Sequence, residues 1–229
     1  MAERQIGMLI FPRLTQLDMT GPYEVLARLP NTKVHLIAHS MAPVKTDRGM
    51  QIVPTITFAD CPPLDVVMVP GGPGQQDLME DEVALGFLRR QAATAKYVTS
   101  VCTGSLVLGA AGLLKGKRAT CHWAAIEHLK PLGAIPVSER VVTDGNIITG
   151  AGVASGIDFA LAVAAVLEGE DVARQIQLQI EYDPAPPFNS GSPKTASAEL
   201  LALLRNRLAP LNEQRREVAQ RVGRKLGVS

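Results

Sequence analysis

Five short apolar segments constrain the fold of this 229-residue chain more than any other feature. They lie at residues 5–11, 33–39, 65–71, 96–102 and 146–150. Several show no alternation of polar and apolar residues, which is typical of strands buried on both faces of a parallel sheet. Helical periods are found at about 22–29, 81–94, 104–114, 123–130, 154–168 and 169–181. The sequence therefore predicts the α/β class, with a mostly parallel sheet flanked by helices on both faces.

Two further segments predict a small antiparallel addition at the edge of this sheet. Residues 49–61 alternate between polar and apolar side chains and contain Pro54. Asp144 and Gly145 separate two β-rich runs and form the strongest hairpin signal in the chain. We expect both segments to pair in antiparallel fashion.

The C-terminal part of the chain is predicted to differ from the rest. Residues 182–194 contain four prolines, which exclude regular structure and predict a rigid loop. From Ala196 onward the pattern favours two amphipathic helices broken near Pro210. The length fits one domain with short additions. We assign residues 1–195 to the α/β domain and residues 196–229 to a C-terminal helical extension, packed on that domain or on a partner subunit.

Charge and cysteine usage exclude several classes of protein. Lysine and arginine total 23 against 22 acidic residues, so no net charge favours binding to nucleic acid or to an anionic membrane. The basic residues after Pro210 are interpreted as a solvated helix face or a subunit contact, with binding to nucleic acid as the alternative. The first residues lack a signal-peptide pattern, and three cysteines without a C-x-x-C pair indicate neither a disulfide framework nor a metal site. We expect a cytoplasmic protein with reduced thiols that acts on small molecules.

Cys102 is the first candidate for chemistry, because a predicted strand gives way to a predicted helix at this residue. In open α/β sheets, chemistry gathers at such strand ends. The positive end of the helix should lower the pKa of the thiol, with the N–H group of Thr103 among the donors. The alternative is a buried cysteine that only packs. Cys61 has no such setting and is expected to be inert, while the adjacent Cys121 and His122 cannot both face one site.

Two other strand ends carry candidate groups. Asp18 lies just past the first strand, where it either caps a helix with Pro22 in its first turn or acts on the thiol of Cys102. The segment VPGGPG at residues 69–74 follows another strand. There the N–H group of Gly72 can approach a bound anion, although a plain tight turn is equally compatible. Together the three strand ends form one stronger signal.

These segments resemble those of the ThiJ/PfpI superfamily over about residues 5–190. The resemblance rests on LDMTGPYEVL, VPGGPG, SVCTG, ATCHW and TGAGVASGIDFAL. It implies a flavodoxin-like, class I glutamine amidotransferase-like fold and a homodimer. The same pattern also resembles the sensor half of regulators that carry a DNA-binding domain, for which we expect this chain to have no room.

Within the superfamily the whole pattern, including YDPAPPF, is similar to the isocyanide hydratases. The resemblance implies conversion of an isocyanide and water to an N-substituted formamide, with no metal or organic cofactor. In that mechanism the thiolate of Cys102 attacks the terminal carbon to give a covalent thioimidate, and Asp18 acts as the general acid. Backbone N–H groups of Thr103 and Gly72 would stabilise developing negative charge.

The resemblance also implies roles for residues around this site. Substrate contacts are expected from Trp123, Tyr182 and Asp183, for which the alternative roles are aromatic packing and a polar helix end. His122 either completes a triad or is a structural histidine beside the site. Ala151 lies between two glycines, and a positive φ there would be strained.

The same residues are compatible with two other functions. The first is a cofactor-free glyoxalase or a deglycase-like thiol enzyme that acts on reactive carbonyls. Aspartate at position 18, where many members of the superfamily carry glutamate, weighs modestly against it. The second is a non-catalytic redox or stress sensor in which Cys102 is simply oxidised.

Overall fold

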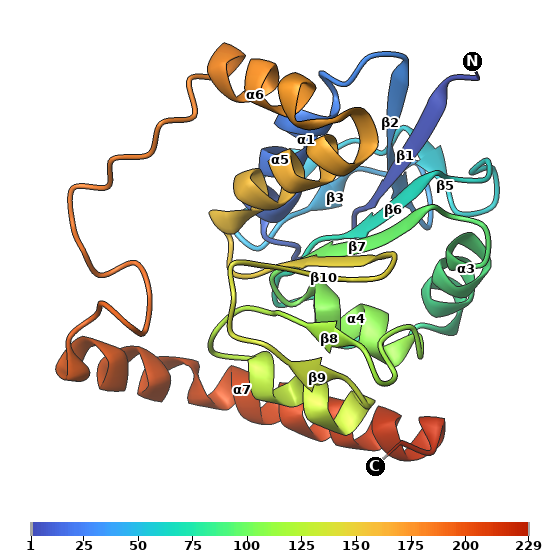
Figure 1. Ribbon diagram of the computed structural model, residues 1–229. Coiled ribbons are helices and arrows are strands. Elements are labelled where there is room, and N and C mark those ends of the chain that lie inside the picture. The colour runs from blue at the N-terminus through green and yellow to red at the C-terminus, as the bar shows by residue number, and fades with distance from the viewer. Residues whose placement is uncertain (1, 229) are drawn as a thin grey trace.

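The computed structural model describes residues 2–228 and confirms the α/β class (Figure 1). Seven strands form one sheet in the order β10-β11-β7-β6-β1-β2-β5. All neighbours pair parallel except β10 and β11, which form the predicted hairpin. The strands are β1 (Arg4–Leu9), β2 (Thr32–Ala38), β5 (Ile56–Thr57), β6 (Val66–Val69), β7 (Tyr97–Val101), β10 (Val141–Asp144) and β11 (Ile147–Gly150).

The centre of the sheet is apolar because its strands are covered on both sides. All four residues of β6 and all four of β11 are buried. Each of the five predicted strands is found, with ends that differ by two residues or fewer. The absence of polar alternation in these segments therefore indicated their position in the sheet correctly.

Helices cover both faces of the sheet, as Figure 1 shows. α1, α5 and α6 pack together on one face, and α3, α4 and α7 lie on the other. The helices are α1 (Gln16–Leu26), α2 (Gln75–Leu78), α3 (Glu82–Ala92), α4 (Gly104–Ala110), the 3-10 helix η1 (Ile126–Leu132), α5 (Ser155–Glu168), α6 (Glu170–Gln179) and α7 (Ala198–Leu226).

Two helices differ from the sequence prediction at their starts. α1 begins at Gln16, so Pro22 lies inside the helix and not in its first turn. This shift puts Asp18 on the helix, in its first turn. The helix expected near residues 123–130 is instead a 3-10 helix that starts at Ile126. Both differences arise because tertiary packing overrides local helix signals.

The short strands form more than one small sheet. β3 (Val44–Lys45) and β4 (Gln51–Ile52) pair antiparallel, apart from the main sheet. β5 joins β2 in parallel, so the prediction that the whole of residues 49–61 pairs antiparallel was wrong for this strand. β8 (Arg118–Ala119) and β9 (Ile135–Pro136) form a second two-stranded pair. The connection between β2 and β3 has only five residues. It is therefore too short to contain a helix.

The last fifth of the chain contains an extended arm followed by one long helix. The arm, residues 181–197, runs outside the body between α6 and α7, as the orange trace in Figure 1 shows. α7 is continuous from Ala198 to Leu226, so the predicted break near Pro210 was wrong. Proline removes one backbone donor, but Ser197 caps the start of the helix and packing of its second half holds the chain helical beyond Pro210. Between residues 2 and 228, no helix is both long and apolar enough to cross a bilayer.

Candidate active site

Cys102 lies in the turn between β7 and α4. Its φ of 58° is in the left-handed region, which a residue with a side chain adopts at a cost of about 1–2 kcal/mol. The backbone N–H of Cys102 donates to the carbonyl oxygens of Gly150 (3.0 Å) and Ala151 (2.8 Å), which hold this conformation. The side chain is almost fully buried. Ala151 itself does not have a positive φ, so the strain considered for it does not arise.

Asp18 is the carboxyl group of the site and has no exposed surface. Its Oδ2 accepts a hydrogen bond from the N–H of Gly71 (3.0 Å), while no donor among the described residues has hydrogen-bond geometry toward Oδ1. Burial raises the pKa of Asp18 to about 7, against the opposing effects of Cys102 and of the Gly71 N–H. The side chain does not cap α1, because its partners come from two other strand ends.

The thiol of Cys102 and the carboxyl of Asp18 form an interacting pair. Burial, and then the negative charge of Asp18, raise the pKa of Cys102 well above its ordinary value, whereas the Thr103 N–H acts in the opposite direction. The predicted lowering of this pKa was therefore wrong in direction. The dipole of α4, a helix of seven residues, is outweighed by complete burial of the sulfur. Two groups that interact in this way titrate as a coupled unit.

Gly71 and Gly72 bring the backbone of another strand end against this pair. A Cβ at Gly71 would lie 2.5 Å from the backbone nitrogen of Thr103 and 2.8 Å from Asp18 Oδ2, so only glycine fits there. The N–H of Gly72 donates to Thr103 Oγ1 (3.0 Å). This N–H is thus already bonded, and Thr103 supplies the backbone donor nearer to the sulfur.

His122 lies beside the site but is not bonded to the pair. Its Nδ1 accepts a hydrogen bond from the N–H of Ala124 (3.2 Å), and its ring lies 5.6 Å from that of Trp123. Burial, helped by the positive charge of Arg215, lowers the pKa of His122 to about 4. Within residues 2–228 no hydrogen bond joins His122 to Cys102 or Asp18. The imidazole is therefore neutral at physiological pH.

Tyr182 and Asp183 occupy the start of the arm. The Tyr182 hydroxyl donates to Asp158 Oδ2 (2.9 Å) on α5, and the same oxygen accepts from Arg140 (2.7 Å). Asp183 is exposed, and its N–H donates to the carbonyl of Glu181 (2.9 Å). The described residues contain no hydrogen bond from either side chain to Cys102 or Asp18. The single chain thus joins Cys102 and Asp18 but not these two predicted substrate contacts.

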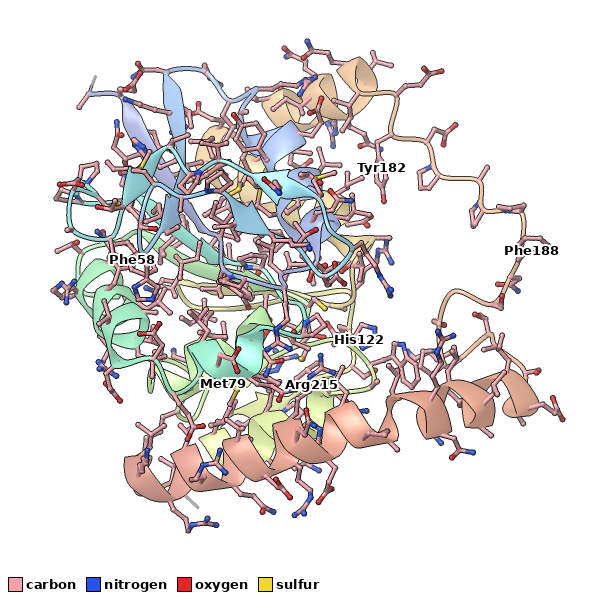
Figure 2. The ribbon with its side chains drawn as sticks, turned by 180° about the vertical axis from the view of Figure 1, so that it is seen from behind. Phe58, Met79, His122, Tyr182, Phe188 and Arg215 are labelled. Carbon is pink, nitrogen blue, oxygen red and sulfur yellow. The ribbon has the colours of Figure 1, made fainter. Side chains whose placement is uncertain are left out.

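Three buried residues near the site were not predicted from the sequence. Cys121 is 1% exposed and interacts electrostatically with Cys102, whose pKa it raises. Arg215 of α7 is 5% exposed, and its Nε donates to Oε1 of the fully buried Gln75 (3.1 Å). Figure 2 shows Arg215, His122 and Met79 gathered between α7 and the sheet. The signal for Arg215 was its spacing from Val218, Ala219 and Val222, which puts it on the apolar face of α7.

Cys61, His35 and His39 have no part in this site. Cys61 follows β5, the edge strand of the sheet, and burial raises its pKa to about 11, which agrees with the prediction that it is inert. His35 is hydrogen-bonded to Gln5 (2.7 Å), whereas His39 pairs with Asp81. Among the residues that the structure describes, no group of three potential ligands could hold a metal ion.

The fold and the site define a class of protein. It has a mostly parallel α/β sheet with a buried thiol on a strained strand-to-helix turn, beside a buried carboxyl from the first helix. The family model described as the DJ-1/PfpI family matches residues 4–166. The chain belongs to this family.

Individual relatives extend the similarity beyond residue 166. The isonitrile hydratase of Pseudomonas putida is 58% identical over 224 residues, which are 98% of each chain. A glutathione-independent glyoxalase of Caenorhabditis elegans is 28% identical over 175 residues, 75% of this chain and 93% of the relative. The crystal structure of a ThiJ/PfpI family protein from Pseudomonas syringae superposes with a TM-score of 0.93 and 45% identity, covering 96% of this chain and 91% of that chain.

Proposed function

We propose that this protein is an isocyanide hydratase, which converts an isocyanide and water to an N-substituted formamide. The observation that carries the proposal is the 58% identity to an isonitrile hydratase, isonitrile being another word for isocyanide. That similarity spans 98% of both chains and so includes the arm and α7, which lie outside the family-wide match at residues 4–166. The glyoxalase relative is less similar and covers less of this chain.

The Cys102–Asp18 pair suits this chemistry because the terminal carbon of an isocyanide must gain both a nucleophile and a proton. The reactive form of the pair holds one proton, which lies on Asp18. In the first step the sulfur of Cys102 bonds to that carbon, and this proton passes from Asp18 to the same carbon. The product is a thioimidate, R–N=CH–S, with Asp18 left as a carboxylate. The pKa of about 7 allows Asp18 to hold either state near neutral pH.

Water completes the reaction in steps that return every group to its starting state. Asp18 takes a proton from the attacking water and passes it to the nitrogen, which gives R–NH–CH(OH)–S. The hydroxyl proton then moves to Asp18 as the C–S bond breaks. Formamide leaves, and the pair again holds one proton. The chain's own side chains are sufficient for these steps.

The turn at Cys102 acts as a nucleophile elbow in this proposal. The left-handed backbone directs the side chain away from the strand, and the N–H of Thr103 stabilises the sulfur as it gains and loses charge. Such donors are typically worth about 3 kcal/mol in a transition state. Gly72 contributes through Thr103 Oγ1, to which it is bonded. Trp123 is proposed as a wall of the substrate pocket beside His122.

The oligomeric state and the cellular location of the protein are also proposals. Exposed apolar side chains on the β3–β4 hairpin and on the arm, such as Met50, Val53 and Phe188, support a homodimer. Three free cysteines suit the reducing cytoplasm. Nearly balanced charge supports a small-molecule isocyanide as the partner in place of nucleic acid or a membrane. Residues 196–229 are proposed to be an extension of the single domain at residues 1–195.

Formamide formation from an aryl isocyanide, followed by ultraviolet absorbance, tests the proposal. We expect steady turnover by the wild type and none by Cys102→Ala, while Cys61→Ala, the matched cysteine control, keeps full activity. Methylglyoxal is offered to the same preparation as a substrate for the glyoxalase alternative. Turnover of methylglyoxal without formamide production would disprove the hydratase function.

A further inference from the structure

Arg215 is a buried cation for which residues 2–228 supply no acidic partner in an ion pair. Its guanidinium group donates from Nε to Gln75 Oε1 (3.1 Å) and from Nη1 to Asn212 Oδ1 (3.1 Å), and both acceptors are neutral. Among the described residues no carboxylate forms an ion pair with it, whereas its neighbour Arg216 pairs with Glu213. An unpaired charge is costly to bury, so a negative charge elsewhere in the interior is needed to balance it.

Hydrogen bonds connect Arg215 to the site through the glycine loop, residues 71–74. The backbone N–H of Gln75 donates to the carbonyl of Gly72 (3.1 Å), and the Gln75 side chain is fully buried. The loop in turn donates from Gly71 to Asp18 and from Gly72 to Thr103. Arg215 therefore holds, through Gln75, the loop that binds the carboxyl group and the threonine of the site.

The charges around Arg215 complete the argument. Any negative charge that the coupled Cys102–Asp18 pair takes up lies in a dry environment, and Arg215 interacts electrostatically with Cys102 and Cys121. The other titratable groups near these residues are His122, His128 and, beside Asp18, Asp47. Burial lowers the pKa of both histidines, which favours their neutral forms. Arg215 is thus the positive charge that faces the pair from α7.

We propose that Arg215 is a positioning residue of the Cys102–Asp18 site. From α7 it fixes the glycine loop through Gln75 and balances the negative charge that the thiol and the carboxyl take up. The role of α7 in turnover rests on the proposed hydratase function, but its effect on the thiol does not. α7 lies outside residues 4–166, so this contribution comes from a part of the chain that the family model does not include.

The variant Arg215→Met separates this role from a structural one. Replacing an unpaired buried charge by an apolar side chain is expected to leave the midpoint of thermal unfolding unchanged or higher. Alkylation of Cys102 by iodoacetamide, followed by mass spectrometry across pH, should instead slow at least about tenfold at pH 7, with its pH midpoint about one unit higher. Formamide production should show a kcat lower by about tenfold or more and a KM changed by less than about twofold.

Three further variants complete the test. Arg215→Lys keeps the charge and should return the alkylation midpoint toward that of the wild type. Arg216→Met, the exposed neighbour, should behave as the wild type in every measurement. If Arg215→Met does not fold, Gln75→Met, which breaks the link to the glycine loop, should show the same fall in kcat.

The outcomes separate the two proposals. An alkylation curve of folded Arg215→Met, or a kcat of Gln75→Met, that matches the wild type would overturn the role of Arg215. A shifted alkylation curve in a protein whose wild type makes no formamide would disprove the hydratase and leave Arg215 as the residue that controls the thiol.

Discussion

Two places on the same edge of the sheet differ in what they bury. At the end of β7 the chain encloses polar groups, Asp18, Thr103 and Cys102, in a closed and strained turn. At the ends of β1 and β2 it leaves an apolar cavity of about 360 Å³. The cavity is lined by Leu9, Ile10, Phe11, Pro12, Ala38, His39, Ser40, Ala42, Pro43, Val44, Lys45, Phe58 and Leu78.

The groups that can carry out chemistry therefore lie outside the apolar cavity. A well-formed apolar pocket is the usual first hypothesis for a binding site. Here the thiol and the carboxyl are instead packed against glycine backbone, and burial raises the pKa of both groups. We therefore expect side chains at the β7 end to contribute to reactivity at the expense of stability, and those around the cavity to contribute to stability alone.

Asp18→Asn should give the largest effects. The pKa of Asp18 is about 7 in the folded protein against a reference value of 3.8, so from about pH 4 to pH 7 the folded state keeps a proton that the unfolded chain has lost. The free energy of unfolding of the wild type should therefore fall as pH rises through this window. Asp18→Asn has no carboxyl that titrates in this window, so its free energy of unfolding should not fall there. At pH 8 it should exceed the free energy of unfolding of the wild type by about 2–4 kcal/mol. Its formamide turnover should fall by about a thousandfold.

Urea unfolding at pH 4.5 and pH 8, together with the formamide assay, measures both effects. Asp77→Asn is the control, because Asp77 is an exposed carboxylate paired with Arg13. It should change neither stability nor turnover appreciably. The same dependence of unfolding on pH in Asp18→Asn and the wild type would contradict the burial of a protonated carboxyl.

Phe58→Ala should have the opposite effect on the two measured quantities, because it should lower stability and leave turnover unchanged. Phe58 is 8% exposed, lines the cavity and contacts the rings of Phe87 (4.8 Å) and His39 (4.9 Å). Its truncation should lower the free energy of unfolding by about 3 kcal/mol, while kcat per folded molecule stays unchanged. Urea unfolding and active-site titration check this, with the exposed Leu178→Ala on α6 as the control. A fall in kcat comparable to that of a site variant would mean that the cavity belongs to the active site.

The same contrast explains how much the sequence could predict. The strands, the hairpin and the strand-end position of Cys102 were predictable because apolar runs and turn residues are local signals. The direction of the Cys102 pKa was not, because burial of the sulfur depends on how α1, the glycine loop and β11 meet around it. Arg215 was missed because charged residues in a helix are usually solvated, and only its spacing from Val218 and Val222 indicated the buried face.

His122→Gln should have the smallest effect and distinguishes between the two roles left open for this histidine. The ring is neutral, since burial lowers its pKa to about 4, and its Nδ1 is occupied by the Ala124 N–H. A glutamine oxygen can accept the same hydrogen bond without a titratable group. We expect kcat to change by no more than about threefold, with the same pH dependence between pH 5 and pH 9.

A loss of kcat of about a hundredfold would instead make His122 a general acid–base group, because removal of such a group typically costs that much or more. In that case the proton path through Asp18 alone would be incomplete, and the β7 end of the sheet would carry three reacting side chains in place of two.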